Sequence, residues 1–196
     1  MSATILANAL SDVREYFERL PDVAEEAAVL AINDVAERKG MGVLKSDMRD
    51  QINFPAGYLE ARLKVSRRAR PGALQAVIQG RDRPTSLARF AAGQTPANTR
   101  GRGVRVTVKR GQTQVMRQAF LINLRNGNTG LAVRLKAGES LRNTQGAVQM
   151  SNGLWLLYGP SVDQVFRSVA EDRADDLAQL ASSEFERQFR RLVSRG

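Results

Sequence analysis

The spacing of apolar residues changes twice along this chain of 196 residues, and this change limits the folds that the chain can adopt. Up to about residue 40, apolar side chains recur every three or four positions, as in a helix that buries one face. From about residue 73 to 136 they alternate with polar ones, as in strands, and from residue 161 the helical spacing returns. The order predicts an α+β fold: a small, mostly antiparallel sheet packed by long N-terminal and C-terminal helices, with long basic loops.

The N-terminal stretch is predicted to be helical on both sides of Pro21. Because proline lacks an amide hydrogen and clashes with the preceding turn, we expect a long helix that is kinked or broken there. Gly40 and Gly42 predict its end, and shorter helices are expected at 43–52 and 56–63. The apolar positions that define the long helix are Leu6, Ala9, Leu10, Val13, Phe17, Leu20, Ala24, Ala28, Ala31, Ile32 and Val35. Such faces are typical of packing, and no cofactor is expected on them.

Four strands are predicted in the middle of the chain, at 73–79, 104–109, 119–124 and 131–136. Residues 126–130, Asn-Gly-Asn-Thr-Gly, predict a tight turn between the last two. Residues 84–103 are rich in Gly, Pro, Thr and Arg, which predicts a long loop that stays mobile until a partner orders it. A second loop is expected at 137–153.

The C-terminal third begins with a short apolar run, from Trp155 to Tyr158, which predicts a final strand with Trp155 and Leu157 on one face. Ser161 and Gln164 then have the spacing of a capping box, so a helix should begin there. A single helix of about 30 residues would span about 45 Å, more than a small domain needs. Part of its apolar face is therefore expected to contact another copy of the chain, through Phe166, Leu177, Phe185 and Phe189.

Composition narrows the chemistry. The chain has no Cys and no His, which excludes disulfides, thiolate zinc sites and imidazole general bases, and we expect no enzyme and no metal. The remaining enzymatic alternative is a nuclease that uses carboxylates, but their spacing is typical of a solvated helical face. These carboxylates are Asp163, Glu171, Asp172, Asp175 and Asp176. No apolar run approaches the roughly 20 residues of a membrane span, and the start lacks a basic leader, so neither membrane insertion nor export is expected.

Charge is concentrated in the middle of the chain. Residues 61–138 contain 17 basic residues and one acidic residue, whereas 1–60 contain 6 and 11 and 139–196 contain 7 and 8. We call residues 100–110 the basic segment; its charged members are Arg100, Arg102, Arg105, Lys109 and Arg110. Three interpretations are open for it: contact with nucleic-acid phosphates, contact with an acidic protein surface, or a solvated strand edge. Sequence-specific recognition is not expected, because no known DNA-reading motif is present.

Five stretches together resemble the minor tail protein Z family of long-tailed bacteriophages. They are AINDVA at 31–36, the basic linker at 63–70, GVRVTVKRG at 103–111, AFLINLRNG at 119–127 and LYGPSVDQVF at 157–166, which precedes a terminal amphipathic helix. The resemblance runs from about residue 25 onward and lies in the order and spacing of the stretches. Residues 137–152 are not part of it.

The resemblance implies a structural virion protein without a catalytic site, formed from one tail-completion domain at 1–196 with helices at 1–60, a basic β-rich region at 61–158 and a C-terminal helix at 159–196. Such a protein forms a ring, expected to be a hexamer, at the head-proximal end of the tail. The implied partners are tail-terminator or tail-tube proteins, head-completion proteins and genomic DNA, but no membrane. The implied location is the virion neck, and the host cytoplasm during assembly. The alternative is a free, non-specific nucleic-acid-binding protein.

Overall fold

The computed structural model describes residues 3–4, 18, 20–99, 101–136, 139–141, 146–150 and 153–195. The chain forms two compact units. Unit 1 contains Met1–Met48, Glu60–Arg81 and Phe166–Gly196, and unit 2 contains Arg49–Leu59 and Asp82–Val165. The predicted α+β class is confirmed, with helices and antiparallel strands in the described residues. That the two units fold as one domain stays a prediction.

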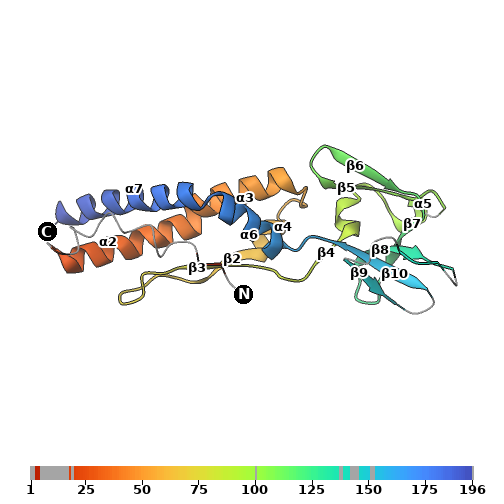
Figure 1. Ribbon diagram of the computed structural model, residues 1–196, viewed down its shortest axis with the longest axis horizontal. Coiled ribbons are helices and arrows are strands. Elements are labelled where there is room, and N and C mark those ends of the chain that lie inside the picture. Colours follow the sequence, from red (N-terminus) through yellow and green to blue (C-terminus); the bar gives the residue numbers. More distant parts are fainter. Residues whose placement is uncertain are drawn as a thin grey trace. The chain divides into compact units, whose positions relative to one another are not determined.

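Unit 1 is built around two long helices, α2 (Pro21–Asp34) and α7 (Ala174–Val193), which run antiparallel and side by side (Figure 1). The residues of α2 that face α7 are small, which lets the two backbones approach closely, and Phe185 of α7 fills the space between them. The fully buried members of this core are Ala24, Ala27, Ala28, Ala31 and Phe185. The prediction that the N-terminal and C-terminal helices pack together is confirmed for these two elements.

Pro21 begins α2 instead of kinking a longer helix; its missing amide hydrogen costs nothing at a first helical position. The expected helix before it lies almost wholly outside the described residues. The helical backbone then continues through a π-helical turn, η2 (Val35–Lys39), into α3 (Gly40–Gln51). The predicted end at Gly40 and Gly42 is therefore wrong. A β-carbon at Gly40 would lie 2.9 Å from a Leu177 methyl group, so this glycine serves close helix packing.

A three-stranded antiparallel sheet completes unit 1, in the order β1 (Ala3–Thr4), β3 (Val77–Gly80) and β2 (Leu63–Arg67). The short helix α4 (Tyr58–Arg62) leads directly into β2. The buried amide of Asn33 in α2 holds the chain beyond β2: its Nδ2 donates to the carbonyl of Ala69 at 3.0 Å, and its Oδ1 accepts from the Ala69 amide at 2.9 Å.

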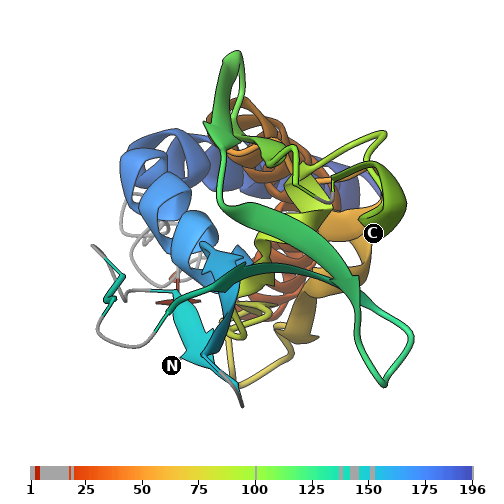
Figure 2. The same ribbon diagram turned by 90° about the vertical axis from the view of Figure 1, so that its right-hand side faces the viewer.

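Unit 2 contains a five-stranded antiparallel sheet and a separate hairpin (Figure 2). The sheet runs β4 (Thr85–Ser86), β10 (Leu154–Gly159), β8 (Thr129–Arg134), β7 (Ala119–Asn123), with β9 (Ala147–Gln149) also paired to β10. The hairpin joins β5 (Val104–Lys109) to β6 (Gln112–Met116). The expectation of one sheet is thus corrected to three sheets among the described residues, because the alternating segments pair in separate groups.

Two local predictions in unit 2 are confirmed. The predicted turn closes β7 onto β8, with Gly127 at a φ of 76° and the Leu124 amide donating to the Asn128 carbonyl at 2.8 Å. The run before the last helices is the strand β10, in which Trp155 pairs with Val133. Trp155 is half-buried, so it lies at the margin of the core and not at its centre.

The predicted mobile loop at 84–103 is instead packed for most of its described length. It contains β4, a 3-10 turn η3 (Leu87–Phe90) and α5 (Pro96–Thr99), and Phe90 is buried. The Thr99 hydroxyl donates to the Thr95 carbonyl at 3.0 Å and accepts from the Leu121 amide of β7 at 3.2 Å. Apolar anchors and a buried hydroxyl explain why a Gly- and Arg-rich composition still forms ordered structure.

The C-terminal helix begins with the predicted capping box. The Ser161 amide donates to the Gln164 side chain at 2.9 Å, and the Gln164 amide donates to the Ser161 hydroxyl at 3.0 Å. However, the expected single helix is two, α6 (Val162–Asp172) and α7, separated by Arg173 with φ −105° and ψ 12°. The Arg173 side chain is held by Asp47 of α3 and by Asp176, each at 2.6 Å. Hydrogen bonds to these carboxylates hold the pKa of Arg173 above its usual range.

Candidate functional site

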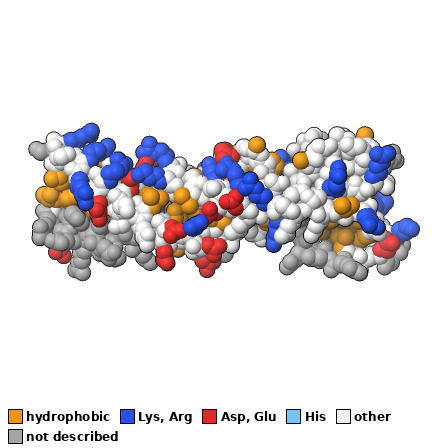
Figure 3. Space-filling view, turned by 90° about the horizontal axis from the view of Figure 1, so that it is seen from above, with side chains coloured by type: hydrophobic (Ala, Val, Ile, Leu, Met, Phe, Trp, Pro, Cys, Tyr) orange, Lys and Arg blue, Asp and Glu red, His pale blue; other side chains and the backbone are white. Residues whose placement is uncertain are grey.

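Almost all of the excess positive charge belongs to unit 2. Its residues include 13 bases and 4 acids, a net charge of +9, whereas unit 1 has 17 bases and 16 acids, a net charge of +1. In the space-filling view, unit 2 at the right shows blue side chains with little red, and unit 1 shows both colours (Figure 3). The contrast between the units is smaller than the contrast along the sequence, because the bases of residues 61–81 belong to unit 1.

The β5 strand carries most of the basic segment and is anchored by buried valines. Val104 and Val106 are buried, while Arg105 between them and Lys109 at the end of the strand are exposed. Val108 is half-buried, because the β5–β6 register shifts between Val106 and Lys109. The twofold alternation of a strand thus anchors the apolar side chains and turns Arg105 to solvent.

Side-chain amides cover the edge of β5 that does not pair with β6. Gln94 binds the backbone of Arg105 twice, donating to its carbonyl at 2.6 Å and accepting from its amide at 2.9 Å. Asn53 adds a backbone bond to the Val108 carbonyl at 2.8 Å and a side-chain bond to that of Thr107 at 3.2 Å. These bonds from Gln94 and Asn53 satisfy backbone groups of β5 that would otherwise pair with another strand. They hold β5 in place and leave its charged side chains exposed for contact.

The charges of the basic segment differ in their surroundings. Arg110 forms an ion pair with Asp50 at 2.7 Å, in spite of the absence of acids near it in the sequence. Arg102, Arg105 and Lys109 are exposed and have no acidic partner in the part of the chain that the structure describes. Arg100 lies outside the described residues. The candidate contact surface therefore consists of Arg102, Arg105 and Lys109, and we call it the β5 basic surface.

The predicted subunit-interface residues are mostly part of the core. Phe166 and Phe185 are fully buried and Leu177 is 2% exposed, so they have no surface left for a neighbouring copy. Phe189 is partly buried and packs against the α2–α7 core, with its ring centroid 5.9 Å from that of Phe185. The assignment of the first three to an interface is corrected: they are buried within the chain, with Phe185 covered by the alanines of α2 and Leu177 close to Gly40 at the start of α3.

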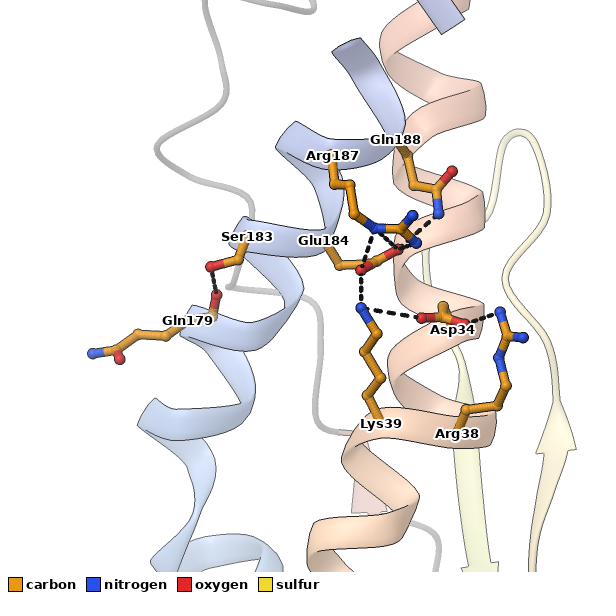
Figure 4. Close-up of polar contacts among 8 residues, drawn as sticks. All are labelled: Asp34, Arg38, Lys39, Gln179, Ser183, Glu184, Arg187 and Gln188. Carbon is orange, nitrogen blue, oxygen red and sulfur yellow. Dashed lines mark hydrogen bonds and ion pairs between the residues drawn. The ribbon is translucent and has the colours of Figure 1, made fainter. Parts of the chain in front are cut away.

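A cluster of charged residues that the sequence did not indicate lies between the helices of unit 1 (Figure 4). The carboxylates of Asp34 and Glu184 are both buried, and Lys39 from the π-helical turn contacts both of them. Arg38 forms an ion pair with Asp34, Arg187 forms one with Glu184, and Gln188 donates to Glu184 at 2.7 Å. The ammonium group of Lys39 therefore links α2, η2 and α7.

Glu184 remains ionised in this cluster. Burial alone would raise the pKa of Glu184, but hydrogen bonds from Arg187, Lys39 and Gln188 outweigh it and lower this pKa from 4.5 to about 2. The same carboxylate raises the pKa of Arg187. A carboxylate so strongly stabilised as an anion is a poor proton donor or acceptor near neutral pH, and its role here is to fix the two helices.

The carboxylates considered for a nuclease do not form a site. Glu171, Asp172, Asp175 and Asp176 are exposed on α6 and α7, whereas Asp163 is buried near the start of α6. Among the residues that the structure describes, no group of three or more acidic side chains is arranged to hold a metal ion. The solvated helical face is the better account of the four exposed carboxylates.

The described part of the chain also contains no helix that combines the length and apolar character of a membrane span. Comparisons of the chain with models of protein families, with curated proteins and with solved structures find no match.

Proposed function

We propose that this chain is a structural virion protein, a tail-completion protein that forms a ring at the head-proximal end of a phage tail and helps to join tail to head along the DNA path. The proposal starts from the resemblance of five stretches to the minor tail protein Z family. The observation that carries it furthest is the separation of charge, with a net +9 in unit 2 and +1 in unit 1. Such a separation fits a protein in which one part holds its own structure and another contacts a polyanion.

The β5 basic surface is suited to contact that does not depend on sequence. Arginine and lysine on an exposed strand bind phosphates by charge, and such phosphate contacts carry no sequence information directly. In a closed ring the same surface would be repeated around the axis, so a modest local field would become strong near the centre. An acidic surface of a neighbouring neck protein offers the same charge complementarity, and the experiment below includes it.

The first test is assembly. The purified chain is measured by size-exclusion chromatography with light scattering, and then mixed with phage tails that lack it and imaged by electron microscopy. Rings, or density added at the head-proximal end of the tails, would support the proposal. A chain that stays monomeric, does not bind tails and binds duplex DNA tightly would instead support the free nucleic-acid-binding protein. Tail-tube and head-completion genes beside its own gene would be independent support.

The second test addresses the surface. A variant with Arg102, Arg105 and Lys109 changed to serine is compared with a control in which Lys64, Arg191 and Arg195, exposed residues of unit 1, are changed to serine. Both variants lose three charges. We expect only the first to reduce particle yield, with a larger defect as salt rises. For DNA binding, the dependence of log affinity on log salt should weaken by about 0.9 for each lost phosphate contact. Equal particle yield and equal salt dependence of DNA binding in the two variants would show that the β5 basic surface is only a solvated strand edge.

A further inference from the structure

A pocket with a volume of about 580 Å³ opens in unit 2. Its size lies in the range of about 300–1,000 Å³ that small-molecule sites occupy. Its lining combines cations, an amide, a carboxylate and one aromatic ring: Arg117, Gln118, Phe120, Arg134, Lys136 and Glu139. We call it the β7–β8 pocket.

The sheet register explains why an aromatic ring and a guanidinium group share this pocket. Phe120 of β7 is directly opposite Ala132 of β8, and Arg134 follows Ala132 by two residues. Side chains two positions apart in a strand lie on the same face of a sheet. Phe120 and Arg134 therefore lie on one face, and the small side chain of Ala132 leaves room between them.

The charge of the pocket is positive. Arg117, Arg134 and Lys136 contribute three cations against the one carboxylate of Glu139. This carboxylate is already engaged, because its Oε2 accepts from the Lys136 amide at 2.9 Å while the Glu139 amide donates to the Lys136 carbonyl at 3.0 Å. Glu139 thus shapes the loop after β8, and cations outnumber carboxylates in the lining of the pocket.

Phe120 distinguishes between the anions that could enter. An acidic peptide needs cations only, whereas a nucleotide offers both a charged phosphate and a flat base. Phe120 is half-buried, so part of its ring is accessible at the pocket while the rest is held by the sheet. Cations beside an accessible aromatic ring are the combination that single-stranded nucleic acids use, because every base can stack.

We propose that the β7–β8 pocket binds one nucleotide unit of a single nucleic-acid strand. Phe120 stacks on the base, and Arg117 and Lys136 bind the adjoining phosphates. The inference goes beyond the proposed function, since a phosphate contact on the β5 basic surface requires no accessible base. It also does not depend on ring formation, because all of the lining residues belong to unit 2 of one chain.

The test measures binding of the full-length chain by fluorescence anisotropy with a labelled short oligothymidine and an abasic oligonucleotide of equal length. We expect Phe120→Leu, which keeps an apolar side chain, to weaken oligothymidine binding by about tenfold and to leave abasic binding unchanged. Arg117→Ser should weaken both. The matched control is Arg125→Ser, an exposed charge of the same unit outside the pocket, which should have the smaller effect. Circular dichroism establishes that each variant is folded.

Several results would overturn the inference. Equal affinity of the wild-type chain for the two oligonucleotides, or an unchanged affinity of Phe120→Leu for oligothymidine, would show that the site does not contact a base. Polyglutamate that competes as well as oligothymidine would identify an acidic-peptide site instead. Displacement by thymidine monophosphate at concentrations similar to those of oligothymidine would identify a free-nucleotide site. Loss of tail binding in the same variants is not expected, and tail assembly therefore separates this inference from the proposed function.

Discussion

An Asp50 carboxylate oxygen lies 2.7 Å from a guanidinium nitrogen of Arg110, so one charge of the basic segment is compensated by a residue 60 positions away. Both side chains are largely exposed, at 64% and 68%. The pair therefore contributes little to stability, typically about 0–1 kcal/mol, but it lowers the positive field beside β5. The contact makes Arg110 differ from its neighbour Lys109, although the sequence alone makes the two appear equivalent.

The first prediction concerns this pair. Asp50→Asn should raise the affinity for duplex DNA and steepen its salt dependence, because it removes a nearby negative charge. Arg110→Ser should weaken binding less than Lys109→Ser, since the charge of Arg110 is already partly offset. The free energy of unfolding, measured by thermal denaturation, should change by less than about 0.5 kcal/mol in all three variants. Reduced DNA affinity in Asp50→Asn would contradict the argument.

The second prediction compares two glycines of α3. A methyl group at Gly40 would meet the Val35 carbonyl at 2.8 Å and Leu177 at 2.9 Å, whereas nothing lies within 4 Å at Gly42. Gly42→Ala should therefore stabilise the chain by about 0.5–1 kcal/mol through helix propensity. Gly40→Ala should destabilise it, by about 1–3 kcal/mol, because the helices must separate. Chemical denaturation measures both, and equal changes would show that α7 does not pack closely here.

The third prediction is a dependence on acid. The pKa of Glu184 is about 2 in the folded chain against an ordinary 4.5, so the folded state favours the anion. This contribution to stability is fully present above about pH 4.5, and it is lost as the pH falls toward 2. Glu184→Gln should be less stable at neutral pH, because Lys39 and Arg187 lose their buried partner, and should lose less further stability in acid. Denaturation at a series of pH values measures this.

The control for this prediction is Glu186→Gln. Glu186 is half-buried on the same helix, and its one ion pair among the described residues is with the exposed Arg190, at 3.2 Å. It should leave both the neutral stability and the acid dependence close to those of the wild-type chain. An acid dependence that is identical in the wild-type chain and Glu184→Gln would assign the effect to other carboxylates.

The fourth prediction tests the assignment of Phe185 to the core. Phe185 is fully buried between α2 and α7, so Phe185→Ala should lower the free energy of unfolding by about 3–5 kcal/mol. Val193→Ser, at a 47% exposed position near the end of α7, should change it by about 0.5 kcal/mol or less. The measurement is chemical denaturation at several protein concentrations. If Phe185→Ala changed only how the free energy of unfolding depends on protein concentration, this residue would instead belong to a subunit interface.

The sequence by itself determined the features that depend on near neighbours. The Ser161–Gln164 capping box joins residues three positions apart, and the Gly127 turn closes within a few residues. The bounds of β5 follow from an alternation that is visible over six residues. In each case the interacting groups are separated by a few bonds, so residue type and spacing are sufficient to predict the structure.

Only the tertiary structure decided which distant residues meet. It brought Asp50 to Arg110, placed Lys39 between Asp34 and Glu184, and put Phe120 on the same sheet face as Arg134 by pairing β7 with β8. It also divided the alternating segments among three sheets. These contacts depend on how helices and strands pack across long separations in sequence, and periodicity reports only that a face is apolar, not what will cover it. The apolar face around Phe185 was therefore predictable, whereas its burial by the alanines of α2 was not.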